Sequence, residues 1–189
     1  MDAIWVPAGV VALAEIGDKT QLLAIVLAAK FRKPVSIILG ILVATLLNHA
    51  AAATLGFYVS QWLEGQMFKL AVGAAFVAMA GWALVPDREE DAAGKRPAGS
   101  VFLTTALAFF LVEIGDKTQI ATSLLAAQYT DVLLITIGTT MGMMLANVPA
   151  VIFGEAVTRI APLKYVRIAA AAIFAVIGVW IILGAPGAP

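Results

Sequence analysis

Glu15-Ile16-Gly17-Asp18-Lys19-Thr20-Gln21 is a heptapeptide that this chain of 189 residues contains twice. It returns, residue for residue, as Glu113-Ile114-Gly115-Asp116-Lys117-Thr118-Gln119. Each copy lies near the middle of a long apolar run, from about Ile4 to Ala29 and from about Phe102 to Ala127. A helix of that length spans the hydrocarbon core of a bilayer, so the charged side chains would lie near its centre. Because an ionised side chain there costs several kcal/mol, the repeat predicts a functional ion site.

The composition around this motif is that of a polytopic membrane protein. Hydrophobic residues make up 62% of the chain, and the mean hydropathy is +0.98. The absence of cysteine excludes disulfides and thiolate metal sites, and a net charge of zero argues against nucleic acid as a partner. Residues 1–5 lack the basic region of a cleavable signal peptide, so we expect the first apolar segment to be retained in the lipid bilayer.

Apolar runs separated by turn and charge signals predict an all-α integral membrane protein with six transmembrane helices. The expected spans are 4–29, 35–59, 67–85, 101–128, 132–156 and 166–184. A polar stretch at 87–100 is the longest break and reads as a solvated cytoplasmic linker. It divides the chain into a first three-helix repeat, 1–86, and a second, 101–189.

The internal repeat extends beyond the motif at a constant offset of 98 residues. Phe76 matches Phe174, and Trp82 matches Trp180. Stripes of small or polar residues recur in the second and fifth spans: Gly40, Ala44, Asn48, Ala52 and Gly56, then Gly138, Gly142, Ala146, Ala150 and Gly154. Such stripes let helix backbones approach closely in lipid. With three spans in each half, the halves must cross the bilayer in opposite directions, which predicts two inverted repeats with a site between them.

The basic residues predict the orientation of the chain. With the N-terminus outside, the inner loops hold nine bases: Lys30, Arg32, Lys33, Arg88, Lys95, Arg96, Arg159, Lys164 and Arg167. The outer loops hold only Lys69. This strong bias predicts that both termini are extracytoplasmic.

On a continuous helix, Glu15 and Asp18 would share one face, as would Glu113 and Asp116. Four facing carboxylates would form an oxygen-only cluster that suits Ca²⁺, Mg²⁺ or Mn²⁺ better than soft metals. Lys19 lies four residues after Glu15, in the favourable order for an ion pair within a helix. The side chains expected to orient the acids or add neutral oxygens are Lys19, Thr20, Gln21, Lys117, Thr118 and Gln119.

Several polar residues near the motif leave two interpretations open. Asn48 and Asn147 could support the site or make structural hydrogen bonds. Gly17 and Gly115 could open the helix locally, so that backbone carbonyls reach the ion, or could allow close helix packing. His49, the only histidine, has no histidine opposite it in the repeat, which disfavours a proton-relay role.

The charge balance of the motif bears on mechanism. Four carboxylates and two ammonium groups leave an empty cluster at −2, which one divalent cation or two protons would neutralise. Since uncompensated charge is costly at this depth, the site favours exchange of a metal ion for protons over uniport.

Two E-x-G-D-[KR]-[TS] motifs in spans one and four of a six-span protein resemble the Gdt family of cation transporters, which belongs to the lysine-exporter superfamily. The resemblance covers the whole chain and implies exchange of Mn²⁺ or Ca²⁺ for H⁺, with the metal as transported substrate and no cofactor. It implies that Glu15, Asp18, Glu113 and Asp116 bind the cation. It also implies a bacterial plasma-membrane location and export of Mn²⁺; a homo-oligomer is left open.

Two other functions remain as alternatives at this point. An intramembrane hydrolase also uses paired acids, but it needs an arginine, or a serine or histidine, beside them, and both motifs lack these residues. An exporter of cationic amino acids would place an organic cation against Lys19 and Lys117, which already answer part of the carboxylate charge. We therefore expect a transporter and not an enzyme.

Overall fold

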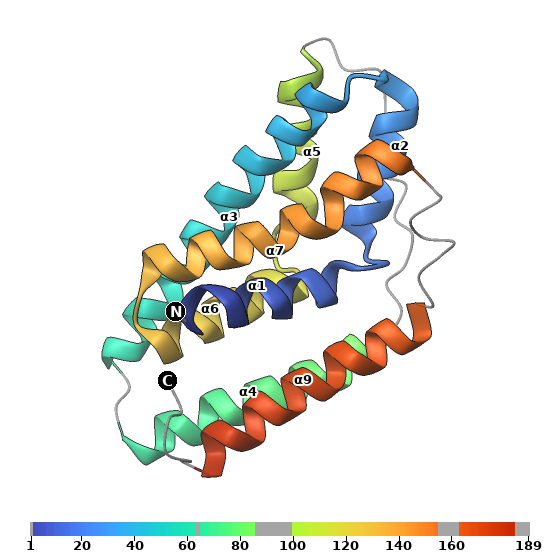
Figure 1. Cartoon of the computed structure of the whole chain (residues 1–189). Helices are drawn as coiled ribbons and strands as arrows, with labels where there is room; N and C mark the ends of the chain where they lie inside the picture. Colours follow the sequence, from blue (N-terminus) through green and yellow to red (C-terminus); the bar gives the residue numbers. More distant parts are fainter. Residues whose placement is uncertain (1, 63–64, 86–99, 155–162, 184–189) are drawn as a thin grey trace.

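The computed structural model describes residues 2–62, 65–85, 100–154 and 163–183, which form eight helices (Figure 1). The helices are α1 (Asp2–Glu15), α2 (Lys19–Phe31), α3 (Pro34–Trp62), α4 (Gln66–Ala83), α5 (Val101–Glu113), α6 (Lys117–Tyr129), α7 (Val132–Phe153) and α9 (Leu163–Leu183). The predicted linker at 87–100 lies, apart from Ser100, outside the described residues.

Four of these helices, α3, α4, α7 and α9, are long and apolar enough to cross a membrane. The expected spans 4–29 and 101–128 are each interrupted, which decides a point that the sequence left open at Gly17 and Gly115. The first run is divided into α1 and α2, and the second into α5 and α6. Each division falls at the motif glycine, because Gly17 has φ 79° and Gly115 has φ 76°. This left-handed conformation ends a right-handed helix, so the two glycines open their helices locally.

The stripes of small residues pack helices of one half against helices of the other. A Cβ atom added to Gly40 on α3 would lie 2.8 Å from the carbonyl oxygen of Phe102 on α5. A Cβ atom added to Gly138 on α7 would lie 2.6 Å from the carbonyl oxygen of Ile4 on α1. Both members of the second contact are displaced by 98 residues from those of the first. The α3–α5 and α1–α7 contacts are therefore reciprocal between the halves, and only small residues fit at them.

Helices α4 and α9 lie side by side (Figure 1), and they also pack on α6 and α1. The rings of Phe76 and Phe174, which match in the repeat, have centroids 6.2 Å apart. A Cβ atom added to Gly73 would lie 2.7 Å from the carbonyl oxygen of Gly178, so the backbones nearly touch. Equivalent helices of the two halves thus meet each other directly.

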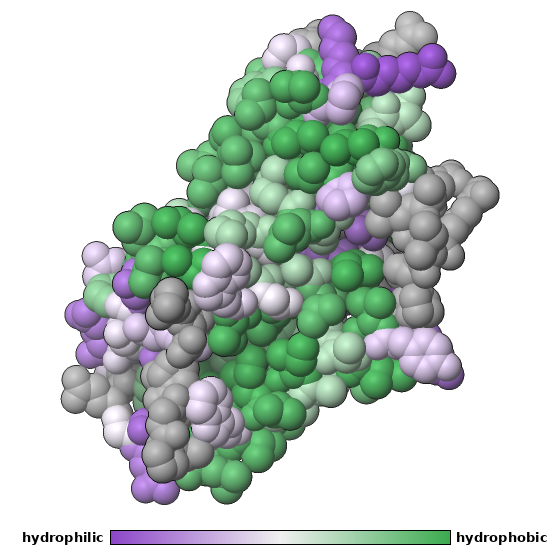
Figure 2. All heavy atoms as spheres, viewed as in Figure 1, coloured by the Kyte–Doolittle hydropathy of each residue, from purple (hydrophilic) through white to green (hydrophobic). Residues whose placement is uncertain are grey.

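The surface is apolar and the interior is partly polar. Green, hydrophobic residues cover most of the face in Figure 2, with purple residues gathered towards the ends. Seven leucines on α3, α5 and α7 are more than half exposed: Leu47, Leu55, Leu103, Leu107, Leu111, Leu133 and Leu145. The acids of both motifs, by contrast, are almost completely buried. This distribution is the one expected of a multi-pass protein whose outer surface faces lipid.

Candidate metal-ion site

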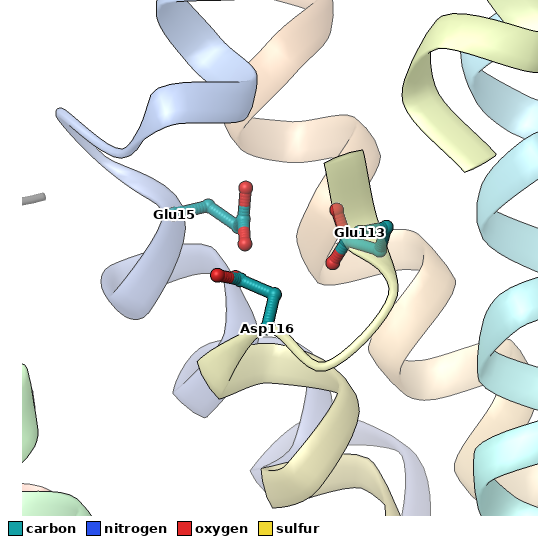
Figure 3. A group of neighbouring side chains, drawn as sticks. All are labelled: Glu15, Glu113 and Asp116. Carbon is teal, nitrogen blue, oxygen red and sulfur yellow. The ribbon is translucent and has the colours of Figure 1, made fainter. Parts of the chain in front are cut away.

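Three carboxylates from the two halves converge at the broken helices. Oxygens of Glu15, Glu113 and Asp116 lie within 4.8 Å of one another, and their side chains are 0%, 1% and 3% exposed. Glu15 is the last residue of α1, Glu113 is the last of α5, and Asp116 directly precedes α6. Their carboxylates point toward a common space (Figure 3). Oxygen ligands in this arrangement suit a hard divalent cation.

Asp18, the fourth acid of the expected cluster, stands apart from these three. Its carboxylate is buried but instead lies 3.7 Å (Oδ1) from Nζ of Lys117, and the residue lines a cleft beside Ala83 and Arg167. The expectation that each glutamate and aspartate share a helical face was wrong. The helix ends at the glutamate, and the aspartate begins the next helix as its N-cap, with φ −80° and ψ 166° at Asp18.

The motif lysines pair across the halves. Nζ of Lys19 lies 3.1 Å from Oδ1 of Asp116, and the reciprocal contact joins Lys117 to Asp18. The expected pairing of Lys19 with Glu15 within one helix is wrong, because the helix break lies between the two residues. Each aspartate forms an ion pair with the lysine of the other copy of the motif, so the two halves are linked electrostatically at the site.

The motif threonines orient the glutamates. The hydroxyl of Thr20 donates to Oε2 of Glu15, and that of Thr118 donates to Oε1 of Glu113 over 2.6 Å. A charge-assisted hydrogen bond of this kind holds one carboxylate oxygen and leaves the other available. The second oxygens, Oε1 of Glu15 and Oε2 of Glu113, are buried without a hydrogen-bond partner among the described residues. They are the natural points of attachment for a cation or a proton.

The motif glutamines brace the broken backbone. The amide N–H of Gly17 donates to Oε1 of Gln21 over 2.9 Å, and that of Gly115 donates to Oε1 of Gln119 over 2.6 Å. These side chains satisfy backbone groups that the interrupted helices leave unpaired. Gln21 also donates to the carbonyl oxygen of Ala146 on α7, over 3.0 Å.

The two asparagines make hydrogen bonds to backbone carbonyls. Nδ2 of Asn48 donates over 3.1 Å to the oxygen of Phe110, in the last turn of α5, where the break removes the next helical donor. Nδ2 of Asn147 donates over 3.1 Å to the oxygen of Met143, while its Oδ1 has no partner in the described part of the chain. The geometry thus gives Asn48 a structural hydrogen bond at the site's edge.

His49 lies next to the site, although the internal repeat disfavoured a functional role for it. Its side chain is completely buried on α3, and Nε2 lies 3.9 Å from Oε1 of Glu113. The repeat places Asn147 at the equivalent position, so internal symmetry gave no reason to favour a histidine. One sequence feature could have indicated its position: His49 follows Asn48, which lies in the stripe of small or polar residues on the second span.

Broken helices that meet at buried, oppositely charged side chains define a class of membrane transport proteins with discontinuous helices around an ion site. The family model of the divalent cation/proton antiporter GDT1 matches this chain twice, at residues 3–91 and 101–188. The chain therefore belongs to the GDT1 family of divalent cation/proton antiporters, which confirms the resemblance seen in the motifs. It is a transporter and not an enzyme.

One relative narrows the comparison further. A protein named "Putative manganese exporter" from Vibrio cholerae serotype O1 (strain ATCC 39541 / Classical Ogawa 395 / O395) is 47% identical over 178 residues. The alignment covers 92% of this chain and 87% of that protein. No solved structure matches the chain.

Proposed function

We propose that this antiporter exports Mn²⁺ from the cytoplasm in exchange for protons and binds the metal ion through Glu15, Glu113 and Asp116. The convergence of these three buried carboxylates from both halves is the observation that carries the proposal. Their oxygens suit Mn²⁺, Ca²⁺ and Mg²⁺, and the manganese exporter named among the relatives favours Mn²⁺ as the physiological ion.

The ion pairs indicate which acidic side chains carry the uncompensated charge of the site. Lys19 offsets Asp116, and Lys117 offsets Asp18, which leaves the charge of −2 on Glu15 and Glu113. Both glutamates have a buried oxygen without a partner in the described ranges. One Mn²⁺ or two protons would neutralise them, whereas a bare pair of carboxylates would carry the full cost of buried charge. Exchange of one metal ion for two protons follows from this balance.

Two inverted three-helix repeats are the architecture that we propose around the site. Two observations support a duplicated unit: the α3–α5 and α1–α7 contacts are related by an offset of 98 residues, and the family model matches the chain in two separate ranges. With three crossings in each of 1–86 and 101–189, the halves run in opposite directions, and the bias of loop bases places both termini outside. Each broken helix pair would then count as one crossing.

A small cleft beside the site is the entrance that we propose for the ion. It is lined in part by Ala14, Gly17, Asp18, Lys117 and Arg167. In the proposed orientation, Arg167 lies at the cytoplasmic end of α9, so this cleft would admit Mn²⁺ from the cytoplasm towards the Asp18–Lys117 pair.

Proton movement in liposomes containing the purified protein tests the function. A gradient of Mn²⁺ should drive H⁺ in the opposite direction, and apparent metal affinity should fall as pH falls because protons compete for the same carboxylates. Parallel assays with Ca²⁺ and Mg²⁺ establish the preferred ion. Glu113→Gln should abolish the exchange. Metal flux that is independent of pH and of the proton gradient, with the membrane potential clamped, would leave a channel or uniporter instead.

A further inference from the structure

The imidazole of His49 lies beside Glu113, one of the three carboxylates of the proposed site. The ring is 0% exposed, and neither nitrogen has a hydrogen-bond partner among the residues that the structure describes. A buried polar ring normally has such a partner, so this arrangement calls for a ligand. Helix α3, which carries His49, packs directly on α5 and α6, which carry Glu113 and Asp116.

The distance from His49 to Glu113 is that of two groups sharing an ion. At 3.9 Å, Nε2 and Oε1 are too far apart for a hydrogen bond. Two ligand atoms held about 2.1 Å from one metal ion lie about 3 Å apart at a right angle and about 4 Å apart at wider angles. An ion shared by the ring and the Glu113 carboxylate, whose Oε1 also accepts a hydrogen bond from Thr118, therefore fits the observed separation.

We infer that His49 supplies a nitrogen ligand to the transported ion and thereby selects a transition-metal ion over Ca²⁺ and Mg²⁺. The inference rests on the metal site proposed above and adds the origin of its selectivity. Carboxylates alone discriminate weakly among hard divalent cations, whereas imidazole binds transition metals and contributes little to Ca²⁺ or Mg²⁺. The second half has Asn147 at the equivalent position, so the nitrogen ligand comes from the first half alone.

Because His49 is the only histidine in the chain, spectroscopy can observe it without a mutation. Protein purified without a histidine tag is loaded with Mn²⁺, and electron spin echo envelope modulation is recorded on the paramagnetic ion. We expect coupling to an imidazole nitrogen, which changes when histidine is labelled with ¹⁵N and disappears in His49→Gln. Bound Mn²⁺ without imidazole coupling in the wild-type protein would overturn the inference.

Selectivity provides the second readout. His49→Asn gives both halves the same residue, and His49→Gln keeps a polar side chain of similar length. In proteoliposomes, each variant should lower the ratio of Mn²⁺ to Ca²⁺ transport about tenfold, mainly through weaker Mn²⁺ binding. Ser60→Ala is the matched control, since it changes a hydroxyl on the same helix, 11 residues from His49 and about 16 Å away along the axis.

The outcomes separate this inference from the proposed function. A wild-type protein that moves no metal against protons would defeat the proposed exchange and the nitrogen ligand together. Wild-type exchange with an unchanged Mn²⁺ to Ca²⁺ ratio in both His49 variants would defeat the nitrogen ligand alone. The spectroscopic test on the wild type decides the question even if a variant fails to fold.

Discussion

Asp18 and Asp116 occupy the same place in the two copies of the motif, yet their surroundings differ. Asp116 lies with Glu15 and Glu113, whereas Asp18 lies against Lys117 at a cleft. A duplicated sequence has therefore produced a site that is not symmetric at the level of single residues. The difference follows from the distances between side chains, since the backbone angles at the two aspartates are nearly the same.

We expect Asp116→Asn to weaken Mn²⁺ binding more than Asp18→Asn does. The first substitution removes charge from a ligand of the proposed site, and a loss of about tenfold or more in affinity should follow, equivalent to about 1.4 kcal/mol. The second removes a buried charge that faces Lys117 outside the three-carboxylate group, and should mainly impair stability and transport. Equilibrium binding of Mn²⁺ to purified variants measures the difference. Equal losses of affinity would place Asp18 among the ligands.

The hydroxyl of Thr118 provides a second test at the residue scale. Thr118→Val removes the 2.6 Å hydrogen bond to Glu113 while almost preserving shape. A hydrogen bond to a charged group contributes about 1.5–3 kcal/mol, so apparent Mn²⁺ affinity should fall by about tenfold or more. Thr118→Ser keeps the hydroxyl and should remain close to the wild type. If valine and serine behave alike in the transport assay, the hydroxyl does not orient the carboxylate.

At the scale of the element, the decisive feature is the pair of breaks between α1 and α2 and between α5 and α6. A continuous helix would bury its backbone groups in its own hydrogen bonds and keep glutamate and aspartate on one face. The break frees the ends of two helices, and the glutamines of the motif take up part of the released hydrogen bonding. Glycine makes this conformation accessible, because the Cβ atom of other residues raises the free energy of a left-handed backbone.

Gly115→Ala should destabilise the protein by about 1–2 kcal/mol through backbone strain alone. An added Cβ atom meets nothing within 4 Å, but φ is +76°. Gly115→Asn should cost less, since asparagine adopts this conformation more readily. Gly81→Ala is the matched control: its Cβ atom also meets nothing within 4 Å, and the residue lies inside α4 without positive φ.

Thermal unfolding in detergent compares these variants. Gly81→Ala should raise the midpoint slightly, because alanine favours a helix by about 1 kcal/mol over glycine. Gly115→Ala should lower it. A midpoint for Gly115→Ala that matches or exceeds the wild type would mean that the turn is not held in the left-handed conformation.

Across the whole molecule, contacts between the halves dominate the packing. Helix α3 packs on α5 and α6, α7 packs on α1, and α4 packs on α9. The ion pairs at the site follow the same rule, since each joins a lysine of one half to an aspartate of the other. A movement of one half against the other would therefore change the site directly, which suits alternating access.

The orientation of the molecule is testable because the chain has no native cysteine. Single cysteines introduced at Gly94 and Ala161, which lie outside the described residues, should react only with reagents that reach the cytoplasm. A cysteine at Ala188 should react from the outside. This expectation rests on the distribution of loop bases. Labelling of Gly94 by an impermeant reagent in intact cells would reverse the topology and the direction of the proposed cleft.

The sequence alone determined the membrane class, the duplication, and the identity of the buried acids. These properties depend on local features: the length of apolar runs, the period of small residues, and the recurrence of one heptapeptide. The stripes through Gly40 and Gly138 also indicated close helix packing, and the structure places both at contacts between the halves. The family could be recognised from the same residues, because the two motifs are complete.

Only the tertiary structure decided which charged groups meet. The sequence left open whether Gly17 and Gly115 break their helices, and a continuous helix gave the wrong partners for Lys19 and Asp18. The break places Asp18 apart from Glu15, whereas Asp116 stays close to Glu113. Packing between helices distant in sequence then brings the lysine of the other copy against each aspartate. The placement of His49 beside Glu113 has the same cause, because it depends on how α3 lies against α5 and not on any local pattern.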